Sequence, residues 1–107
     1  MKAKLCFVPP GGGEQDFKID VELPGVPNPG DYIVVVENDK LKGGDDYQGL
    51  HQGYIVRRCW WWVTDGKFDF LIVEAEFAVP FEPTKDHQSA LKMYQARGRK
   101  AQDMKWC

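Results

Sequence analysis

The residues best suited to chemistry lie in one short stretch, where two arginines precede three consecutive tryptophans. Arg57 and Arg58 are followed, after one cysteine, by Trp60, Trp61 and Trp62. Aromatic rings beside guanidinium groups can stack nucleic-acid bases or hold a flat organic ligand. The same pattern is also typical of tryptophans that fill a core beside an arginine that pairs with an acid, because buried aromatics dominate core energetics. The stretch therefore indicates a candidate binding surface, with a purely structural role as the alternative.

Groups that could catalyse a reaction are scattered along the chain. Glu74 and Glu76 would share one face of a strand as paired carboxylates, but Arg57 beside them favours a salt-bridged surface. His51 and His87 fall outside the expected strands, and no metal-ligand spacing surrounds them in the sequence. Since no nucleophile–base pair is visible either, we predict that the protein is not an enzyme and has no cofactor, metal or catalytic residues.

Two loops have compositions that sometimes bind ions. Residues 9–13 are Pro-Pro-Gly-Gly-Gly, but the phosphate-binding pattern continues to Gly-Lys-Ser/Thr and a helix, whereas Glu14 and Asp16 follow here. Residues 38–52 hold several aspartates without the alternating spacing of a calcium loop. We interpret the first as a hairpin turn, and we expect residues 39–52 to be the most mobile internal segment.

A β-hairpin over residues 53–79 must position the candidate surface. Two runs of β-branched and aromatic residues, 54–63 and 68–79, flank Asp65-Gly66, which is the strongest short-range hairpin signal because both residues tolerate positive φ. A turn centred on these two residues places Trp61 opposite Phe70, Trp60 opposite Leu71 and Arg57 opposite Glu74.

This register divides the hairpin into a core face and an outer face that is only partly polar. The outer face cannot remain uncovered, and its cover could be the C-terminal helix, a ligand or a second copy of the chain. We predict a homodimer anchored by Trp61, because symmetric self-association is common and Trp is enriched at interfaces. The predicted core face comprises Tyr54, Val56, Trp60, Trp62, Leu71, Val73, Ala75 and Phe77. The predicted interface comprises Ile55, Arg57, Cys59, Trp61, Phe70, Ile72, Glu74 and Glu76.

The rest of the chain predicts a small mainly β (α+β) domain. Residues 3–8, 17–23 and 32–36 read as strands, and the last, apolar on both sides, is expected in the middle of the sheet. Asp86 is expected to cap a helix over residues 87–97 that ends at Gly98. We predict a five-stranded, strongly bent antiparallel sheet or a partly open SH3-like or OB-like barrel with a C-terminal helix, or else an open sheet with the helix across one face. The domain would span residues 1–107, divided into the sheet (1–79), the helix (84–98) and a tail (99–107).

Composition narrows the class of protein further. The chain has 107 residues and a net charge of −2, so it lacks the overall basic field that favours nucleic-acid binding. No apolar stretch reaches the roughly 18 residues of a membrane span, and the start lacks a signal-peptide core. Its three cysteines, Cys6, Cys59 and Cys107, show no disulfide spacing. We therefore expect a cytoplasmic protein without membrane contact.

Three segments resemble one group of bacterial proteins. Residues 7–14 read Phe-Val-Pro-Pro-Gly-Gly-Gly-Glu, residues 30–33 read Gly-Asp-Tyr-Ile, and residues 55–58 read Ile-Val-Arg-Arg before the tandem tryptophans. These segments are similar to small uncharacterised proteins encoded in bacterial integron gene cassettes. The resemblance implies a bacterial cytoplasmic origin and supplies no catalytic or binding residues.

Two functions remain open from the sequence. The first is a homo-oligomerising interaction module of unknown role that uses the outer face of the 53–79 hairpin. The second is a module that binds a small ligand or single-stranded nucleic acid through Arg57, Arg58 and the tryptophans. The partner protein or small molecule is not identified by the sequence.

Overall fold

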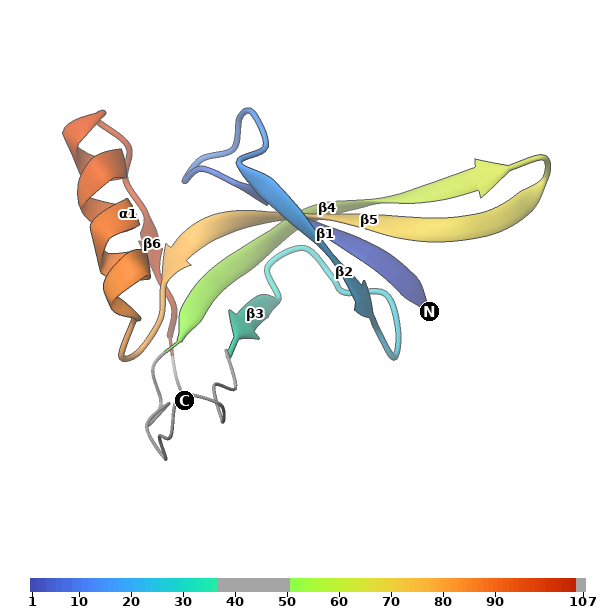
Figure 1. The fold of residues 1–107 in the computed structure, drawn as a ribbon, viewed down its shortest axis with the longest axis horizontal. Helices are drawn as coiled ribbons and strands as arrows, with labels where there is room; N and C mark the ends of the chain where they lie inside the picture. Colours follow the sequence, from blue (N-terminus) through green and yellow to red (C-terminus); the bar gives the residue numbers. More distant parts are fainter. Residues whose placement is uncertain (37–50, 106–107) are drawn as a thin grey trace.

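The computed structural model describes residues 1–36 and 51–105, which form one strongly curled sheet with a helix at one end (Figure 1). The predicted fold class is confirmed, since the sheet is a five-stranded half-barrel followed by a C-terminal helix. A short sixth strand in the tail was not predicted. No helix in residues 1–36 and 51–105 is long and apolar enough to cross a membrane. The elements are β1 (Lys2–Val8), β2 (Phe17–Glu22), β3 (Tyr32–Val35), β4 (Gln52–Thr64), β5 (Lys67–Val79), α1 (Lys85–Ala96) and β6 (Gln102–Asp103).

The sheet is organised around β5. The strand order is β2-β1-β5-β4-β3, and β6 pairs with the far end of β5. The β1–β2, β4–β5 and β3–β4 pairs are antiparallel as expected, but β1–β5 and β5–β6 are parallel. The sheet is therefore mixed. Parallel strands need a long connection between them, and the chain between β1 and β5, which contains β2, β3 and β4, provides it.

The core lies on one face of this sheet and is closed by α1. Phe77 of the core packs against two side chains of the helix. The His87 ring stacks on the Phe77 ring with centroids 3.9 Å apart, and the Tyr94 ring meets the Phe77 ring edge-on with centroids 4.9 Å apart. The helix begins two residues earlier than predicted, because Thr84, and not Asp86, accepts a hydrogen bond from the backbone N–H of His87. The buried core residues are Ala3, Leu5, Phe7, Tyr54, Val56, Leu71, Val73, Ala75, Phe77 and Tyr94.

The strand β3 lies at an edge, and its predicted place in the middle of the sheet is wrong. Among the described residues it pairs with β4 alone. Its apolar side chains face two different clusters, since Ile33 and Val35 pack on the core while Val34 packs against Met104 on the other side. The two-sided apolar pattern thus reflects the C-terminal segment that covers this strand.

The tail is part of the fold. Its strand β6 pairs with Ala78 and Val79, and Met104 is buried against Ile55 and Ala78. Gly53 makes this packing possible, because a Cβ at that position would press on Met104 Sδ and lie 2.8 Å from Pro80 Cβ. The outer side of the hairpin's base is therefore covered by the chain's own C-terminal segment.

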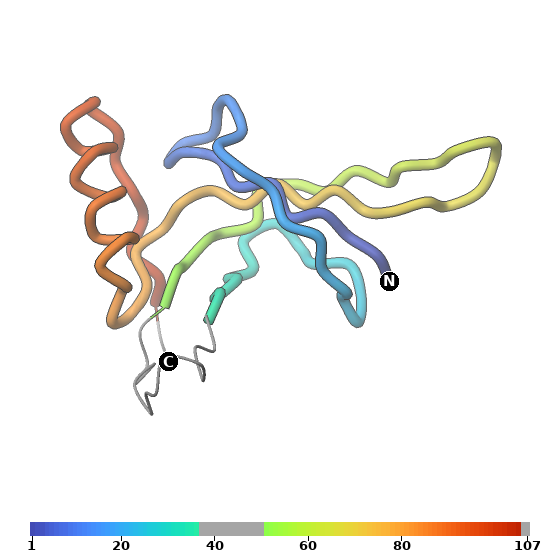
Figure 2. Tube along the Cα trace, viewed as in Figure 1, coloured from blue at the N-terminus to red at the C-terminus, as the bar shows by residue number. Residues whose placement is uncertain are grey.

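Beyond this base, the hairpin of β4 and β5 extends past every other strand as a two-stranded ribbon (Figures 1 and 2). We call residues 58–70 the hairpin arm. The pairing of β1 with β5 starts only at Leu71, and that of β3 with β4 ends at Ile55. Within the described part of the chain, the two strands of the arm therefore pair only with each other.

The predicted register holds at both ends of the hairpin and fails between them. Thr64 lies opposite Lys67 at the turn and Gly53 opposite Ala78 at the base, as predicted. A bulge at Asp69 and a second at Arg57 offset the pairs between them by one residue. Trp60 therefore lies opposite Ile72, and not opposite Leu71 as predicted. The expected mobility of residues 39–52 falls mostly outside the described residues.

Candidate interaction surface

The bulge at Arg57 brings two arginines onto one face of the sheet. Ile55 lies opposite Glu76 and Arg58 opposite Glu74, so Arg57 is the extra residue between two pairs on the outer face. Arg58 Nε is 2.9 Å from Glu74 Oε2, and Arg57 Nε is 3.8 Å from Glu74 Oε1. The predicted pairing of Arg57 with Glu74 is thus present as an ion pair, although Arg58 is the residue directly opposite.

A second acid completes the cluster and ties it to the glycine-rich loop. Glu76 Oε1 is 3.3 Å from Arg57 Nη1, and its Oε2 accepts a 2.9 Å hydrogen bond from the Gly11 N–H. Glu74 and Glu76 are only 8% and 6% exposed. Two guanidinium groups and two carboxylates therefore form a partly buried cluster whose charges cancel, and desolvation makes such a cluster depend on its complete set of partners.

The loop over residues 9–13 is held against this cluster, and its three consecutive glycines all have positive φ. Gly12 has a φ of +93°, and a Cβ there would lie 3.0 Å from Arg57 Cζ. Arg99, which follows α1, donates hydrogen bonds to the carbonyl oxygens of Pro10 (3.0 Å) and Gly12 (2.8 Å). The loop therefore has a structural role as a cover for the ion cluster.

The three tryptophans lie on the hairpin arm and are largely in solvent. Trp60, Trp61 and Trp62 are 45%, 58% and 50% exposed. The predicted burial of Trp60 and Trp62 in the core is wrong, because the Asp69 bulge turns them to the outer face beyond the end of the core. Trp61 is instead on the same side as the core, although it is exposed there too.

Both faces of the arm carry aromatic rings. On the outer face, Trp62 stacks on Phe70 with ring centroids 5.6 Å apart, and Arg58 Cζ lies 5.5 Å from the Trp60 ring. On the opposite face, Trp61 meets Phe68 edge-on at 5.6 Å. Because neither face is covered by a described element, the ring contacts within the arm leave large apolar areas in water.

A hollow of about 520 Å³ lies at the root of the arm on the outer face. Its lining combines the three tryptophans and other apolar side chains with the buried Glu74. Gly13 and Gln15, in and just after the glycine-rich loop, line it as well. The lining residues are Cys6, Val8, Gly13, Gln15, Trp60, Trp61, Trp62, Ile72 and Glu74.

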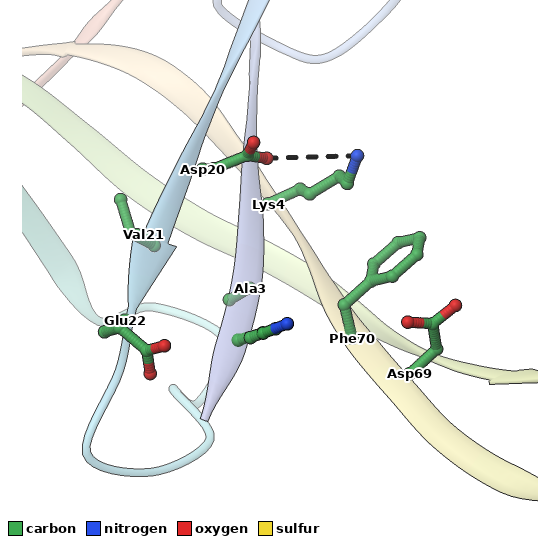
Figure 3. Close-up of a pocket in the computed structure, with 8 residues that line it drawn as sticks. Ala3, Lys4, Asp20, Val21, Glu22, Asp69 and Phe70 are labelled. Atoms are coloured by element: carbon green, nitrogen blue, oxygen red, sulfur yellow. Dashed lines mark ion pairs between the residues drawn. The ribbon is translucent and has the colours of Figure 1, made fainter.

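A second hollow, of about 410 Å³, lies between β1, β2 and the start of β5 (Figure 3). Lys4 spans it, with its Nζ 3.9 Å from Asp20 Oδ1 and 4.9 Å from the centre of the Phe70 ring. Asp69 and Glu22 border the same hollow from either side (Figure 3). Two lysines, Lys2 and Lys4, line it together with three acids, so the charges of both signs largely offset each other and present no charge field for a ligand of one sign.

The eight residues of the predicted interface are divided by the structure among four environments. Ile55 is buried under Met104, and Arg57, Glu74 and Glu76 belong to the ion cluster. The two bulges place Cys59 and Trp61 on the core side of the sheet, so their predicted place on the outer face is wrong. The remaining two, Phe70 and Ile72, lie on the outer face of the hairpin with Trp60 and Trp62, which the sequence had placed in the core.

Outside the ion cluster, the pKa values of four groups are shifted in the direction that favours the neutral form. Burial raises the pKa of the Cys6 and Cys59 thiols, so neither is activated as a thiolate. Burial lowers the pKa of His87, whose Nε2 lies 2.7 Å from the Ala78 carbonyl oxygen. Burial and a hydrogen bond to Asp16 raise the pKa of Tyr94. Within residues 1–36 and 51–105, no group of three or more His, Cys, Asp or Glu residues is placed to hold a metal ion.

No protein-family model, curated protein or solved structure matches the chain at a significant level. Function is therefore inferred from the geometry and chemistry of the surface itself.

Proposed function

We propose that the protein is a self-associating interaction module that uses the hairpin arm as its contact surface. One observation carries this proposal: three half-exposed tryptophans project from the domain on a two-stranded ribbon. Val63 and Phe68, 58% and 45% exposed, extend the apolar surface to the tip. This contact surface replaces the one expected from the sequence, with Trp60, Trp62 and Phe70 on its outer face and Ile72 next to it at the root of the arm.

The energetics of the arm favour a partner. An isolated two-stranded hairpin is only marginally stable in water. Burying its exposed apolar surface against a partner contributes about 25 cal/mol of favourable free energy per Å². The arm carries few charges between Cys59 and Phe70, namely Asp65, Lys67 and Asp69. Such a surface resembles the apolar centre of a protein interface, where Trp is enriched and charges are depleted.

Light scattering of the purified protein at micromolar concentrations tests this function. We expect a dimer for the wild type and a monomer for Trp60→Ser/Trp62→Ser, whose altered residues lie outside the core. Phe81→Ser is the matched control, because Phe81 is 64% exposed but lies outside the arm, and it should leave the dimer intact. A monomeric wild type overturns the proposed function, and a dimeric Trp60→Ser/Trp62→Ser variant overturns the choice of surface.

The hollow at the root of the arm supports a second candidate function, the binding of a small flat organic molecule. The tryptophan rings in its lining could stack on a flat ligand. Glu74 Oε2 makes an ion contact with Arg58 but no hydrogen bond of normal geometry within the described residues. An aromatic amine could stack there and donate to this carboxylate. Titration of aniline, followed by isothermal titration calorimetry, tests this function, and a binding heat that Trp62→Ser does not reduce contradicts it.

Binding of single-stranded nucleic acid has less support than either function. It would need the positive charge of Arg57 and Arg58 beside the tryptophans, yet both arginines are paired with Glu74 and Glu76. A cytoplasmic location remains part of the proposal, and the free thiols of Cys6 and Cys59 are compatible with a reducing compartment.

A further inference from the structure

One edge of the hairpin arm has no partner strand in the part of the chain that the structure describes. The pairing of β4 with the preceding chain ends at Val56, whose C=O accepts from Gly30 N–H and whose N–H donates to Asp31 C=O, both at 2.8 Å. Beyond Val56, no strand among the described residues lies beside β4 on the side away from β5. Residues 58–64 therefore present a row of backbone donors and acceptors along one edge.

This edge lacks the features that keep sheet edges apart. Monomeric proteins protect such edges with lysine, proline, an inward charge or a bulge within the edge. Between Cys59 and Thr64 the chain has no charge and no proline, and the Arg57 bulge lies just before the open stretch. An unprotected apolar edge of this kind is suited to pairing with another strand.

We propose that two copies of the chain pair through this edge, antiparallel, with their two-fold axis at Trp61. The inference rests on the proposed self-association and specifies its geometry. Trp61 is the midpoint of residues 58–64, so the antiparallel register places Trp61 opposite its own copy. The pairs on either side are Trp60 with Trp62, Cys59 with Val63 and Arg58 with Thr64, each twice by symmetry.

The side chains are self-complementary in this register. The central pairs are Trp with Trp, and cross-strand aromatic pairs stabilise a sheet. At each end, Arg58, whose side chain is 58% exposed, comes opposite Thr64 of the second copy. Thr64 Oγ1 donates a 3.3 Å hydrogen bond to Asp69 Oδ2 on the same outer face, so each arginine meets an acid of the other copy. No two like charges lie opposite each other.

A disulfide cross-link tests the register. The substitution Val63→Cys places a thiol opposite the natural Cys59 of the second copy. Within one chain these two positions are four residues apart on an extended strand, roughly 13 Å, which is beyond disulfide reach. We expect mild oxidation of this variant to give a covalent dimer whose peptide map links position 63 to Cys59. Phe68→Cys, on the other strand of the arm, is the control and should not link to Cys59.

Two outcomes separate this inference from the function on which it rests. A dimer by light scattering that yields no link between position 63 and Cys59 overturns the edge pairing and leaves self-association standing. A monomeric wild type overturns both.

A charge-swap experiment supplies a second measurement that needs no oxidation. Trp61→Glu and Trp61→Lys should each be monomeric, because like charges would meet on the axis. An equimolar mixture should form a heterodimer, with circular dichroism confirming that each variant is folded. A mixture that stays monomeric beside a dimeric wild type overturns the placement of the axis.

Discussion

Neutralising Glu76 should destabilise the fold although the side chain keeps its shape. In Glu76→Gln the amide oxygen can still accept from the Gly11 N–H, but the charge that faces Arg57 Nη1 at 3.3 Å is lost. Arg57 then keeps only the longer contact to Glu74, at 3.8 Å. Breaking a buried ion pair costs about 3–5 kcal/mol, and the remaining acid together with the partial exposure of Arg57 reduces this to about 2 kcal/mol.

Urea unfolding followed by circular dichroism measures this loss. With a slope of roughly 1–3 kcal/mol per M, a change of about 2 kcal/mol lowers the midpoint by about 1 M. Glu22→Gln is the matched control, because that side chain is 77% exposed, and its unfolding free energy should change by less than about 0.5 kcal/mol. A Glu76→Gln variant as stable as this control would refute the cluster as a coupled unit. So would strict additivity with Arg57→Met in a double-mutant cycle.

Two further changes test the other end of the molecule. Gly53→Ala should cost about 1–3 kcal/mol by overpacking, and less in a Met104→Ala background, as measured by urea unfolding, because the new methyl group presses on Met104. Equal costs in both backgrounds would contradict the docking of the tail. Burial lowers the pKa of His87 below its ordinary 6.5, so unfolding takes up a proton and stability should fall as the pH drops below about 6.5. His87→Gln should lose this part of the pH dependence, and an unchanged profile would contradict it.

The sequence predicts the elements of this fold well because their signals are local. The Asp65-Gly66 turn fixes the hairpin, with Asp65 at a φ of 50° and Gly66 at 76°, and Gly98 ends the helix with a φ of 76°. The strict alternation of β2 also holds, since Ile19 and Val21 pack on the core. Each of these features depends on neighbours within a few residues, which a single sequence displays.

The candidate surface was harder to predict, because it depends on two bulges and a docked tail. An extra residue at Asp69 reverses the faces of all three tryptophans, and no local pattern marks that position. The second bulge, at Arg57, compensates for the first. The strand pairs at the base of the hairpin therefore agree with the predicted register, while those in its middle are shifted by one residue. Met104 covers Ile55 from a segment too polar to be recognised as part of the core.

The parallel pairing of β1 with β5 has a consequence for the kinetics of folding. The β4–β5 hairpin closes through a two-residue turn and can form early, whereas β1 can join the sheet only when segments 68 positions apart in the sequence meet, as in the pair of Ala3 with Leu71. Loop-closure entropy must be overcome before this long-range pairing contributes, and folding rates fall as contacts become less local. We therefore expect the docking of the β1–β2 hairpin to limit the folding rate, so that substitutions in β1 such as Leu5→Ala mainly slow folding while leaving the early hairpin intact.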